Sequence, residues 1–234
     1  HGVGRRMSAR SFLVTGTDTG IGKTHSSVAL LHALRASGLR AVGMKPIASG
    51  CDWIDGRWRN EDALALQAAS DPRPAYADIN PVALQEATAP TLAALAAGVT
   101  VDVAALYAAH ARLASNADVV LVEGAGGWDA PLAEGLEHQD FARQIGGAVV
   151  LVVGLKLGCL SHARLTARAI RADGCRLVGW IGNRIDPGFA RADDYVHLLA
   201  DALAAPCLGV LPFAADVNGS PATLSLDPAW IATL

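Results

Sequence analysis

Short apolar runs alternate along the chain with longer amphipathic stretches. Six runs rich in Val, Leu and Ile have the length of strands that are buried on both faces. They predict strands at residues 12–15, 41–45, 119–123, 148–153, 177–181 and 207–211. Helical periodicity predicts helices at residues 23–37, 62–69, 90–97, 102–115, 140–145, 161–172 and 193–203, and the polar segment 51–60 is expected to be a surface loop. Strands that alternate with helices indicate an α/β fold with a doubly wound, mostly parallel sheet.

The chain is expected to form one domain over residues 1–234, since its sequence shows no internal repeat, linker or low-complexity tract. Its length also suits one domain, because single hydrophobic cores stop growing at roughly 250–300 residues. Residues 1–6 are interpreted as a remnant added in cloning, which makes Met7 the expected natural start. In a doubly wound sheet, ligands bind beyond the carboxyl ends of the strands, so the residues that follow each strand are the first candidates for chemistry.

Composition and charge exclude several classes of function. The net charge is −3 and no cluster of Lys and Arg occurs, so nucleic acid is not an expected partner. The longest apolar stretch, residues 145–155, is shorter than the about 20 residues that span a bilayer, so no membrane association is expected. No signal-peptide core follows Arg5 and Arg6. The four cysteines lie far apart and lack metal-ligand spacing, which indicates reduced thiols in a cytoplasmic protein.

Lysine is rare in this chain. Only Lys23, Lys45 and Lys156 occur among nineteen basic residues, and the other sixteen are arginine. Such a bias towards arginine makes each remaining lysine a candidate for a specific role. Lys156 stands two residues before Gly158 and receives no role from the sequence.

A glycine-rich loop follows the first expected strand and leads directly into the first expected helix. It runs from Gly16 to Thr24 with the sequence G-T-D-T-G-I-G-K-T. The backbone N–H groups of such a loop cradle phosphate oxygens, and the helix dipole favours the same anion. Lys23 is expected to neutralise the β- and γ-phosphates of a nucleotide, and the Thr24 hydroxyl to ligate Mg²⁺. Thr17 stands where the usual pattern has its first glycine, so a variant P-loop is predicted.

The second and third expected strands end in charged groups. Pro46 biases Lys45 toward an extended backbone that could direct its ammonium into the crevice; a solvated strand-end charge is the alternative. Asp62 either caps the start of its helix or reaches a metal on the crevice side, whereas Glu61 is expected to act in the first turn. Glu123 ends a buried apolar strand, where a charge is costly unless it is paired or metal-bound. It is therefore predicted to be a second Mg²⁺ ligand.

Two further segments follow later strands. Small residues at Gly158 and Cys159, just before the helix expected at 161–172, could bind an anion such as a carboxylate through backbone N–H groups. For Cys159 the backbone N–H, not the sulfur, is expected to be the useful group. Asn183 follows the fifth expected strand, and its amide can both donate to and accept from adenine. The alternative is guanine, because the segment also approaches the N-K-x-D pattern of GTPases, with Arg184 in place of the lysine.

Taken together, these motifs resemble the dethiobiotin synthetase family. The resemblance is carried by G-T-D-T-G-I-G-K-T (16–24), M-K-P-I-A-S-G (44–50), R-N-E-D-A-L-A-L (59–66), V-E-G-A-G-G-W (122–128) and V-G-L-K-L-G-C (153–159). It continues through G-W-I-G-N (179–183) and L-G-V-L-P (208–212), so it spans nearly the whole chain in one order. It implies a P-loop NTPase-like fold and a ligase that needs ATP and Mg²⁺.

The resemblance implies a reaction in which 7,8-diaminopelargonic acid, CO₂ and ATP give dethiobiotin, ADP and phosphate. A carbamate would form on one amine and attack the γ-phosphate, and the second amine would then close the ureido ring by displacing phosphate from the carbamic–phosphoric anhydride. The resemblance also implies a homodimer in which the substrate tail crosses the interface. Its carboxylate would meet the partner's helix amides at the positions of Gly158, Cys159 and Ser161.

The resemblance also assigns roles residue by residue. Catalytic roles fall to Lys45, Lys23 and Thr19, substrate binding to Ser49, Gly158, Cys159 and Ser161, and Mg²⁺ binding to Thr24, Asp62 and Glu123. The implied nucleotide-binding residues are Gly20, Ile21, Gly22, Lys23, Thr24, His25, Asp62, Glu123, Gly124, Ala125, Gly126, Asn183, Arg184, Pro212 and Phe213.

Two other functions were compared with this one. A corrin-amidating synthetase of the ATP-dependent amidotransferase group shares the variant loop, but it needs a glutaminase domain for which 234 residues leave no room. A nucleotide-switch ATPase that recruits partners carries a second lysine in the loop, where this chain has Asp18. Such a switch would also have no need of Lys45 and Ser49.

Overall fold

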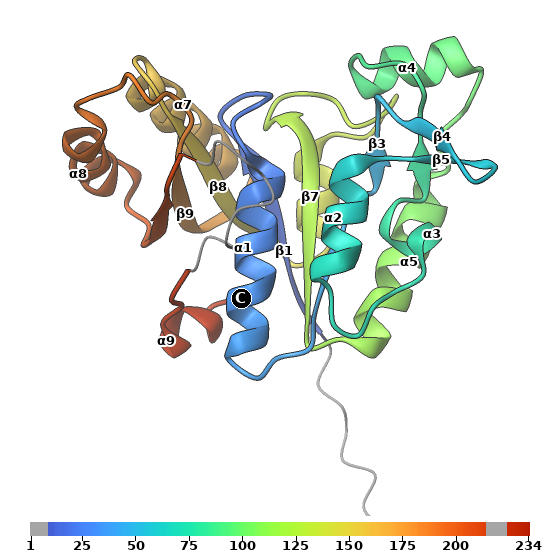
Figure 1. Cartoon of the computed structure of the whole chain (residues 1–234), viewed down its shortest axis with the longest axis horizontal. Coiled ribbons are helices and arrows are strands. Elements are labelled where there is room, and N and C mark those ends of the chain that lie inside the picture. Colours follow the sequence, from blue (N-terminus) through green and yellow to red (C-terminus); the bar gives the residue numbers. More distant parts are fainter. Residues whose placement is uncertain (1–8, 214–223) are drawn as a thin grey trace, which may run out of the picture.

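A computed structural model describes residues 9–213 and 224–234 of the chain. A six-stranded parallel sheet runs through its centre in the order β10-β9-β8-β1-β7-β2 (Figure 1). Its strands are β1 (Arg10–Gly16), β2 (Ala41–Met44), β7 (Val119–Gly127), β8 (Ala148–Leu155), β9 (Arg176–Arg184) and β10 (Cys207–Leu211). Two short pairs lie outside this sheet: β3 (Ile47–Ala48) with β6 (Val82–Ala83), and β4 (Asp52–Ile54) with β5 (Arg57–Arg59).

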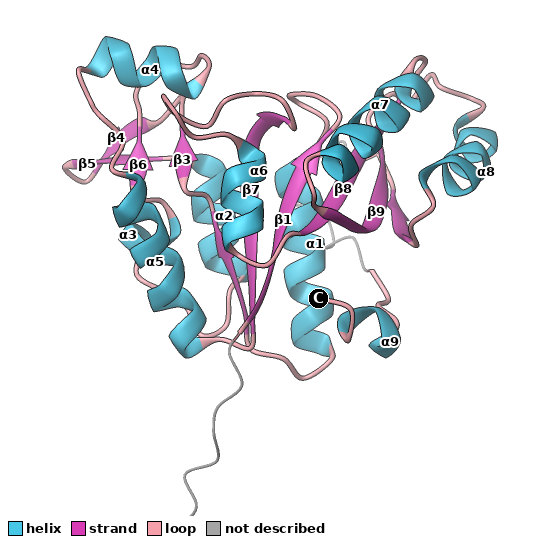
Figure 2. Ribbon diagram, turned by 180° about the vertical axis from the view of Figure 1, so that it is seen from behind, coloured by secondary structure: helices cyan, strands magenta, loops and turns pink. Residues whose placement is uncertain are grey.

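Helices cover both faces of the sheet, as the two opposite views show (Figures 1 and 2). One face carries α1 (Lys23–Ala36), α2 (Glu61–Ala69) and α9 (Pro228–Ile231), whose residues share one hydrophobic cluster. The other face carries α5 (Val103–Asn116), α6 (His138–Gln144), α7 (Cys159–Ala172) and α8 (Ala192–Leu203). The remaining helices are α3 (Tyr76–Ile79) and α4 (Pro90–Ala97). The expected α/β, doubly wound fold with a parallel sheet is confirmed.

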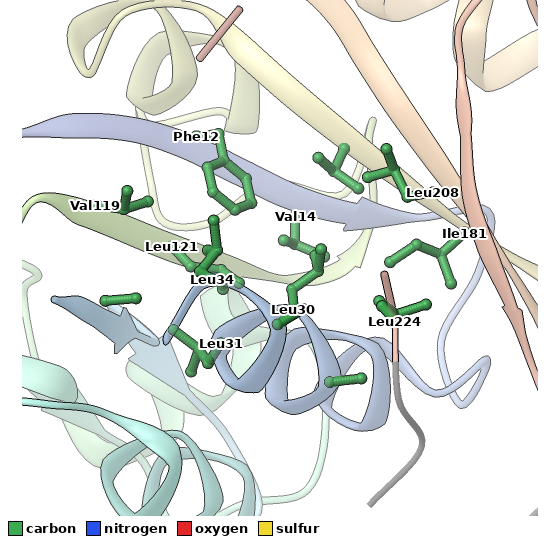
Figure 3. Close-up of a cluster of buried hydrophobic side chains, with 14 of the residues drawn as sticks. Phe12, Val14, Leu30, Leu31, Leu34, Val119, Leu121, Ile181, Leu208 and Leu224 are labelled. Atoms are coloured by element: carbon green, nitrogen blue, oxygen red, sulfur yellow. The ribbon is translucent and has the colours of Figure 1, made fainter. Parts of the chain in front are cut away.

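Strand β1 shows how the two faces are separated. Phe12 and Val14 point to the cluster on the α1 side, whereas Leu13 between them belongs to the cluster on the α5 side. On the α1 side these side chains pack against Leu30, Leu34 and their neighbours (Figure 3). Because β1 is buried on both faces, apolar and polar residues do not alternate along it.

Four strands, β1, β7, β8 and β9, extend further than their apolar runs predict, and β7 and β9 extend furthest at their carboxyl ends. β7 continues to Gly127 and β9 to Arg184, four and three residues past the expected ends at 123 and 181. The ladder persists because neighbouring strands pair with these polar or small residues, as Gly16 does with Gly127 and Gly154 with Asn183. Asn183 therefore lies inside a strand and not after it.

The expected surface loop at 51–60 is wrong in part, because this segment contains the antiparallel hairpin of β4 and β5. A turn with Asp55 and Gly56 at positive φ joins the strands, and Trp53 packs edge-on against Trp58. Trp53 remains largely exposed, which agrees with the surface position. The Asp-Gly pair between two aromatic residues was the hairpin signal in the sequence.

Two helix starts also differ from expectation. α6 begins at His138, not at 140, because Glu137 is the N-cap of a capping box in which Asp140 is the third helical residue. α7 begins at Cys159, not at 161, directly after Gly158 in the left-handed region. The first shift adds the polar residues His138 and Gln139 to a helix, and the second adds Cys159 and Leu160 directly after the glycine N-cap, so a periodicity of apolar residues did not mark either boundary.

The interpretation of residues 1–6 as a remnant, with Met7 as the start, concerns residues outside the described part of the chain. Across the described residues, none of the helices combines the length and hydropathy that a membrane crossing requires.

Candidate active site at the carboxyl ends of the strands

The glycine-rich loop joins β1 to α1, as the sequence predicts. Gly20 and Gly22 have φ values of 72° and 83°, a region that glycine adopts without strain. Gly22 is the N-cap of α1 and offers no side chain to the first turn. The first N–H groups of a helix have no partner within it. This end of α1 can therefore receive an anion.

Ile21 supports the loop from below. A Cβ on Gly16 would lie 2.8 Å from Ile21 Cδ1, and one on Gly154 would lie 2.9 Å from Ile21 Cγ2. The Ile21 side chain is buried, so only its backbone can face a nucleotide. Gly16, the first glycine of this variant loop, thus leaves room for the buried Ile21 side chain.

Lys23 lies folded back on its own loop. Its Nζ donates to the Asp18 carbonyl at 3.0 Å, and the side chain is buried. Burial lowers the pKa of Lys23, with a further contribution from the charge of Lys45, while Glu123 and Asp62 act in the opposite direction. A phosphate bound next to Lys23 would stabilise its ammonium and so offset the cost of burying it.

Thr24, Lys45, Asp62 and Glu123 converge beside this loop. The Thr24 hydroxyl donates to Glu123 Oε1 at 2.8 Å. The Lys45 ammonium donates to the same oxygen at 2.8 Å and to Asp62 Oδ2 at 2.5 Å. Lys45 and Glu123 are buried, whereas the Asp62 side chain is 41% exposed. The structure therefore favours the interpretation that Lys45 faces the crevice over that of a solvated strand-end charge.

The charges of this cluster stabilise one another. Burial disfavours the ammonium of Lys45, but Glu123 and Asp62 outweigh it and raise the pKa of Lys45 above its ordinary value. Burial of Asp62 acts against its charge as well, yet Lys45, Thr24 and Lys23 lower the pKa of Asp62. The ammonium and the carboxylate of this pair are both held in their charged forms.

Position in the helix distinguishes Asp62 from its neighbours. Asn60 is the N-cap of α2, since its Oδ1 accepts from Ala63 N. Glu61 and Asp62 follow in the first turn, where acidic residues favour the helix dipole. Asp62 alone of these acidic residues meets Lys45. Asp62 therefore does both: it lies in the first turn of α2 and its carboxylate faces Lys45.

The oxygens of this cluster suit a hard cation. Glu123 Oε2 is fully buried without a hydrogen-bond partner, and the Thr24 hydroxyl and the Asp62 carboxylate lie against the same group of residues. Mg²⁺ typically takes one or two carboxylates and completes its shell with phosphate oxygens and water. No larger group of His, Cys, Asp and Glu that could hold a metal occurs in residues 9–213 and 224–234.

Asn80 fixes the backbone of Lys45, a contact that the sequence analysis missed. Its Nδ2 donates to the Lys45 carbonyl at 2.9 Å and to the Val82 carbonyl at 3.0 Å. Its Oδ1 accepts from the Tyr76 hydroxyl, whose oxygen accepts from Asn60 N. This chain of hydrogen bonds links the start of α2, which carries Asp62, to the residue after β2, which is Lys45. It therefore helps to hold the two partners of the ion pair in place. The Asn80-Pro81 dipeptide was the only local signal.

A cavity of about 510 Å³ lies next to the loop. Its lining includes Thr19, Ser49, Thr88, Gly126 and Pro131. Thr19 comes from the phosphate loop, Ser49 from the segment after β3, and Gly126 from the end of β7. The candidate catalytic residue Thr19 and the candidate substrate-binding residue Ser49 are thus brought to one cavity, which Ala125 and Ala130 also line.

Asn183 contacts the phosphate loop directly. Its buried Nδ2 donates to the Ile21 carbonyl at 2.9 Å. This bond uses one of the two N–H groups of the amide and leaves its oxygen and the second N–H as possible contacts to a base. β10 ends at Leu211 opposite Asn183, and Pro212 and the half-exposed Phe213 follow. Arg184, by contrast, is engaged in an ion pair with Asp193.

The amino end of α7 differs from expectation in one contact. Cys159 N already donates to the Lys156 carbonyl at 3.1 Å, so its N–H is not available to an anion. The next N–H groups, of Leu160 and Ser161, belong to the first turn of α7 and are the better candidates. Burial raises the pKa of the Cys159 thiol, which agrees with the assignment of no role to its sulfur. Gly158 is the N-cap, with a φ of 93°.

Lys156 gains a contact that no sequence pattern suggested. Its Nζ lies 3.7 Å from Asp18 Oδ2, between half-exposed side chains. Asp18 Oδ1 accepts from Thr19 N at 2.8 Å. Asp18 therefore joins the phosphate loop to the turn before α7, at the position where switch ATPases carry their second lysine.

His138 is a buried residue that the sequence analysis did not single out. Its Nδ1 lies 2.6 Å from the Ala130 carbonyl, while Nε2 is buried without a partner. A Cβ on Gly124 would approach His138 Nε2 to 2.5 Å, so Gly124 leaves room for the ring. Burial lowers the pKa of His138 to about 4. His25, an expected nucleotide residue, also has a buried Nε2 without a partner.

The chain is similar to known proteins over most of its length. Residues 10–220 match the family described as AAA domain. The ATP-dependent dethiobiotin synthetase BioD of Xanthomonas oryzae pv. oryzae (strain PXO99A) is 54% identical over 214 residues, which cover 92% of this chain and 96% of that protein. The protein of the same name from Xylella fastidiosa (strain 9a5c) is 58% identical over 206 residues, covering 88% and 91%.

Solved structures support the fold. The MinC:MinD cell division protein complex of Aquifex aeolicus matches with a TM-score of 0.54 and 16% identity, covering 88% of this chain and 83% of that chain. A ParA family ATPase from Chlorobium tepidum matches with a TM-score of 0.51 and 15% identity, covering 88% and 85%. At this level of identity the likeness concerns the P-loop NTPase fold alone.

Substitution of Gly22 by Ala should destabilise the fold through Asn183. The new Cβ would lie 2.0 Å from Asn183 Nδ2, and the backbone there is left-handed. We expect a loss of about 2–4 kcal/mol in the free energy of unfolding, from strain and overpacking together. Gly20→Ala is the matched control, because it has the same backbone strain but nothing within 4 Å. Urea denaturation should show partial rescue of Gly22→Ala by Asn183→Ala; equal losses at Gly20 and Gly22 would contradict the contact.

His138→Phe should reduce the sensitivity of the fold to acid. The folded protein binds a proton at His138 only near pH 4, against an ordinary pKa of 6.5, so unfolding takes up protons between these values. The stability that neutral His138 contributes is complete above pH 6.5 and is lost as the pH falls toward 4. Between pH 7 and about 4.5 the wild type should lose about 2–3 kcal/mol more than His138→Phe. The exposed His197→Asn is the control in urea denaturation, and equal losses for all three proteins would refute the prediction.

Proposed function

The chain belongs to the family of ATP-dependent dethiobiotin synthetases, and on that premise we propose that the cluster beside its P-loop carries out the ring closure of biotin biosynthesis. The substrates would be 7,8-diaminopelargonic acid, CO₂ and ATP, and the products dethiobiotin, ADP and phosphate. The observation that carries the proposal is the convergence of Lys23, Lys45, Thr24 and two carboxylates beside a cavity that contains Ser49.

The reaction brings two anions together, a carbamate and a triphosphate. Attack of a carbamate oxygen on the γ-phosphorus releases ADP, and attack of the second amine on the activated carbonyl releases phosphate. Both steps need concentrated positive charge in a site that excludes water. Lys23 and Lys45 supply ammonium groups from buried positions, which strengthens their electrostatic effect. Thr19 and Ser49 would orient the carbamate from the walls of the cavity.

Thr24, Asp62 and Glu123 would hold Mg²⁺. The unpartnered Oε2 of Glu123 and the hard oxygen donors of the set support this assignment. When bound, the cation would neutralise charge on the β- and γ-phosphates during transfer. The loop residues Gly20, Ile21 and Gly22, together with His25 in the first turn of α1, would contribute backbone contacts to the phosphates.

The nucleotide base would lie between the ends of β9 and β10. Asn183 would face the base edge with its remaining amide groups, and Pro212 and Phe213 would line the ring. Gly124, Ala125 and Gly126, at the end of β7, would border the phosphate and substrate side. Arg184 would assist only if its ion pair with Asp193 opens. Adenine is the base that this arrangement is proposed to read.

The substrate tail would end at α7 of a partner subunit in a homodimer. Gly158 and the first-turn N–H groups near Ser161 would receive the carboxylate, with the correction that Cys159 contributes packing and not its N–H. We further propose one P-loop domain and a cytoplasmic location without nucleic-acid or membrane partners. The four free cysteines and the net charge of −3 support these last points.

Wild-type protein should release ADP only when diaminopelargonate and bicarbonate are both present with Mg²⁺ and ATP. Dethiobiotin should form in equal amount, because each ring closure consumes one ATP. Mass spectrometry of the product together with a coupled ADP assay measures both. Robust ATP hydrolysis without either substrate, with no dethiobiotin formed, would favour the switch ATPase instead.

Mixing two inactive variants should restore activity if the site spans two subunits. Lys23→Ala disables the phosphate loop, and Ser161→Trp blocks the amino end of α7. Random reassociation gives half mixed dimers with one intact site each, so we expect about a quarter of the wild-type dethiobiotin yield. Arg168→Trp, on an exposed later turn of α7, is the control and should stay active. No activity above that of the separate variants would place the whole site within one subunit.

A further inference from the structure

The Lys45 ammonium lies among the oxygens that are proposed to bind Mg²⁺. It donates to Asp62 at 2.5 Å and to Glu123 at 2.8 Å, and the Thr24 hydroxyl shares the same Glu123 oxygen. The ammonium thus contacts both carboxylates of the proposed metal set. A lysine that served only the substrate would have no need of these two contacts.

The contacts have an electrostatic reason. Glu123 is fully buried and Asp62 is partly buried, so their two negative charges need compensation in the absence of a metal. Lys45 supplies that compensation directly, because its ammonium donates to both carboxylates.

Arrival of a dication changes this balance. Mg²⁺ bound to Asp62 and Glu123 would compete with the ammonium for the same oxygens and would repel its charge. The backbone of Lys45 cannot follow, because Asn80 Nδ2 holds its carbonyl and its N–H donates to the Ile79 carbonyl at 2.8 Å. Only the four-carbon side chain is free to move.

We propose that Lys45 is the resident counterion of Asp62 and Glu123, and that Mg²⁺ displaces its ammonium from these two carboxylates. The inference rests on the proposed function of this site and deepens it. Metal loading would free the Lys45 ammonium from its contacts with the two carboxylates.

Magnesium binding without nucleotide tests the competition. Isothermal titration calorimetry with MgCl₂ alone should show at least about tenfold tighter binding to Lys45→Met than to wild type, since the ammonium no longer occupies the carboxylates. Lys156→Met, which removes the half-exposed lysine paired with Asp18, is the matched control and should bind Mg²⁺ as wild type does. Equal affinities of Lys45→Met and wild type would overturn the proposal.

Thermal unfolding in EDTA gives a second readout. Lys45→Met should melt below wild type and recover when MgCl₂ is added, whereas wild type should respond little. If Lys45→Met is unfolded in EDTA, the double variant Lys45→Met/Glu123→Gln tests whether the uncompensated charge of Glu123 is the cause. It should fold without Mg²⁺ and show no response to the cation. A double variant as unstable as the single one would mean that Lys45 acts by packing, against the proposal.

Lysine signals can report the displacement directly, because the chain contains only three lysines. Protein labelled with ¹³C and ¹⁵N at lysine should give separate side-chain signals, assigned with Lys45→Arg and Lys156→Arg. Addition of Mg²⁺ to the complex with a non-hydrolysable ATP analogue should shift the Lys45 signal and speed its ammonium hydrogen exchange. A Lys45 signal that stays unchanged when the metal binds would refute displacement.

The outcomes separate this inference from the function on which it rests. If the wild-type protein forms no dethiobiotin but Mg²⁺ displaces the Lys45 ammonium, the proposed function is refuted and the displacement by Mg²⁺ is supported. A protein that forms dethiobiotin, but in which Lys45→Met gains no affinity for Mg²⁺, would retain the function and refute the displacement.

Discussion

The charge of one buried carboxylate constrains the whole site. Glu123 stands at the end of the apolar part of β7 with no exposed surface, a position in which an unpaired ion costs several kcal/mol. Lys45 from the end of β2 and Thr24 from α1 both approach the same Glu123 oxygen. Three segments that are distant in sequence are therefore held together at one point. Removal of any one of them leaves a buried charge or donor without its partner.

The anion sites follow from the way the helices begin. α1 and α7 both start after a glycine in the left-handed region and carry no side-chain cap. α2 and α5 start differently, because the side chains of Asn60 and Asp102 accept from their first turns. An uncapped amino end keeps N–H groups for a ligand. The same feature would serve a phosphate at α1 and, in the proposed dimer, a carboxylate at α7, while Lys156 and Asp18 link the two regions.

Much of the fold and part of the site could be predicted from local sequence. The apolar runs located every strand of the central sheet, and the glycine-rich sequence located the loop between β1 and α1, because both depend on residues that are neighbours in the chain. Strand ends were predicted less well, since Gly127 and Asn183 pair through neighbouring strands and not through their own hydrophobicity. The hairpin at 52–59 was missed for a related reason: its Asp-Gly turn was present in the sequence, but its strands are too short for a periodicity.

Local sequence was sufficient for the fold class, for the glycine-rich loop and for the choice of candidate side chains. It left open whether Asp62 acts only at the start of its helix and whether Lys45 points into solvent. The folded chain answers both questions, because each depends on a partner from another segment: Lys45 meets Asp62 and Glu123, and in the same way Asn183 meets Ile21. His138 and Asn80 entered the site in the same way. Patterns along a chain record local preference, whereas the compensation of buried charge and buried polar groups is settled between segments in three dimensions.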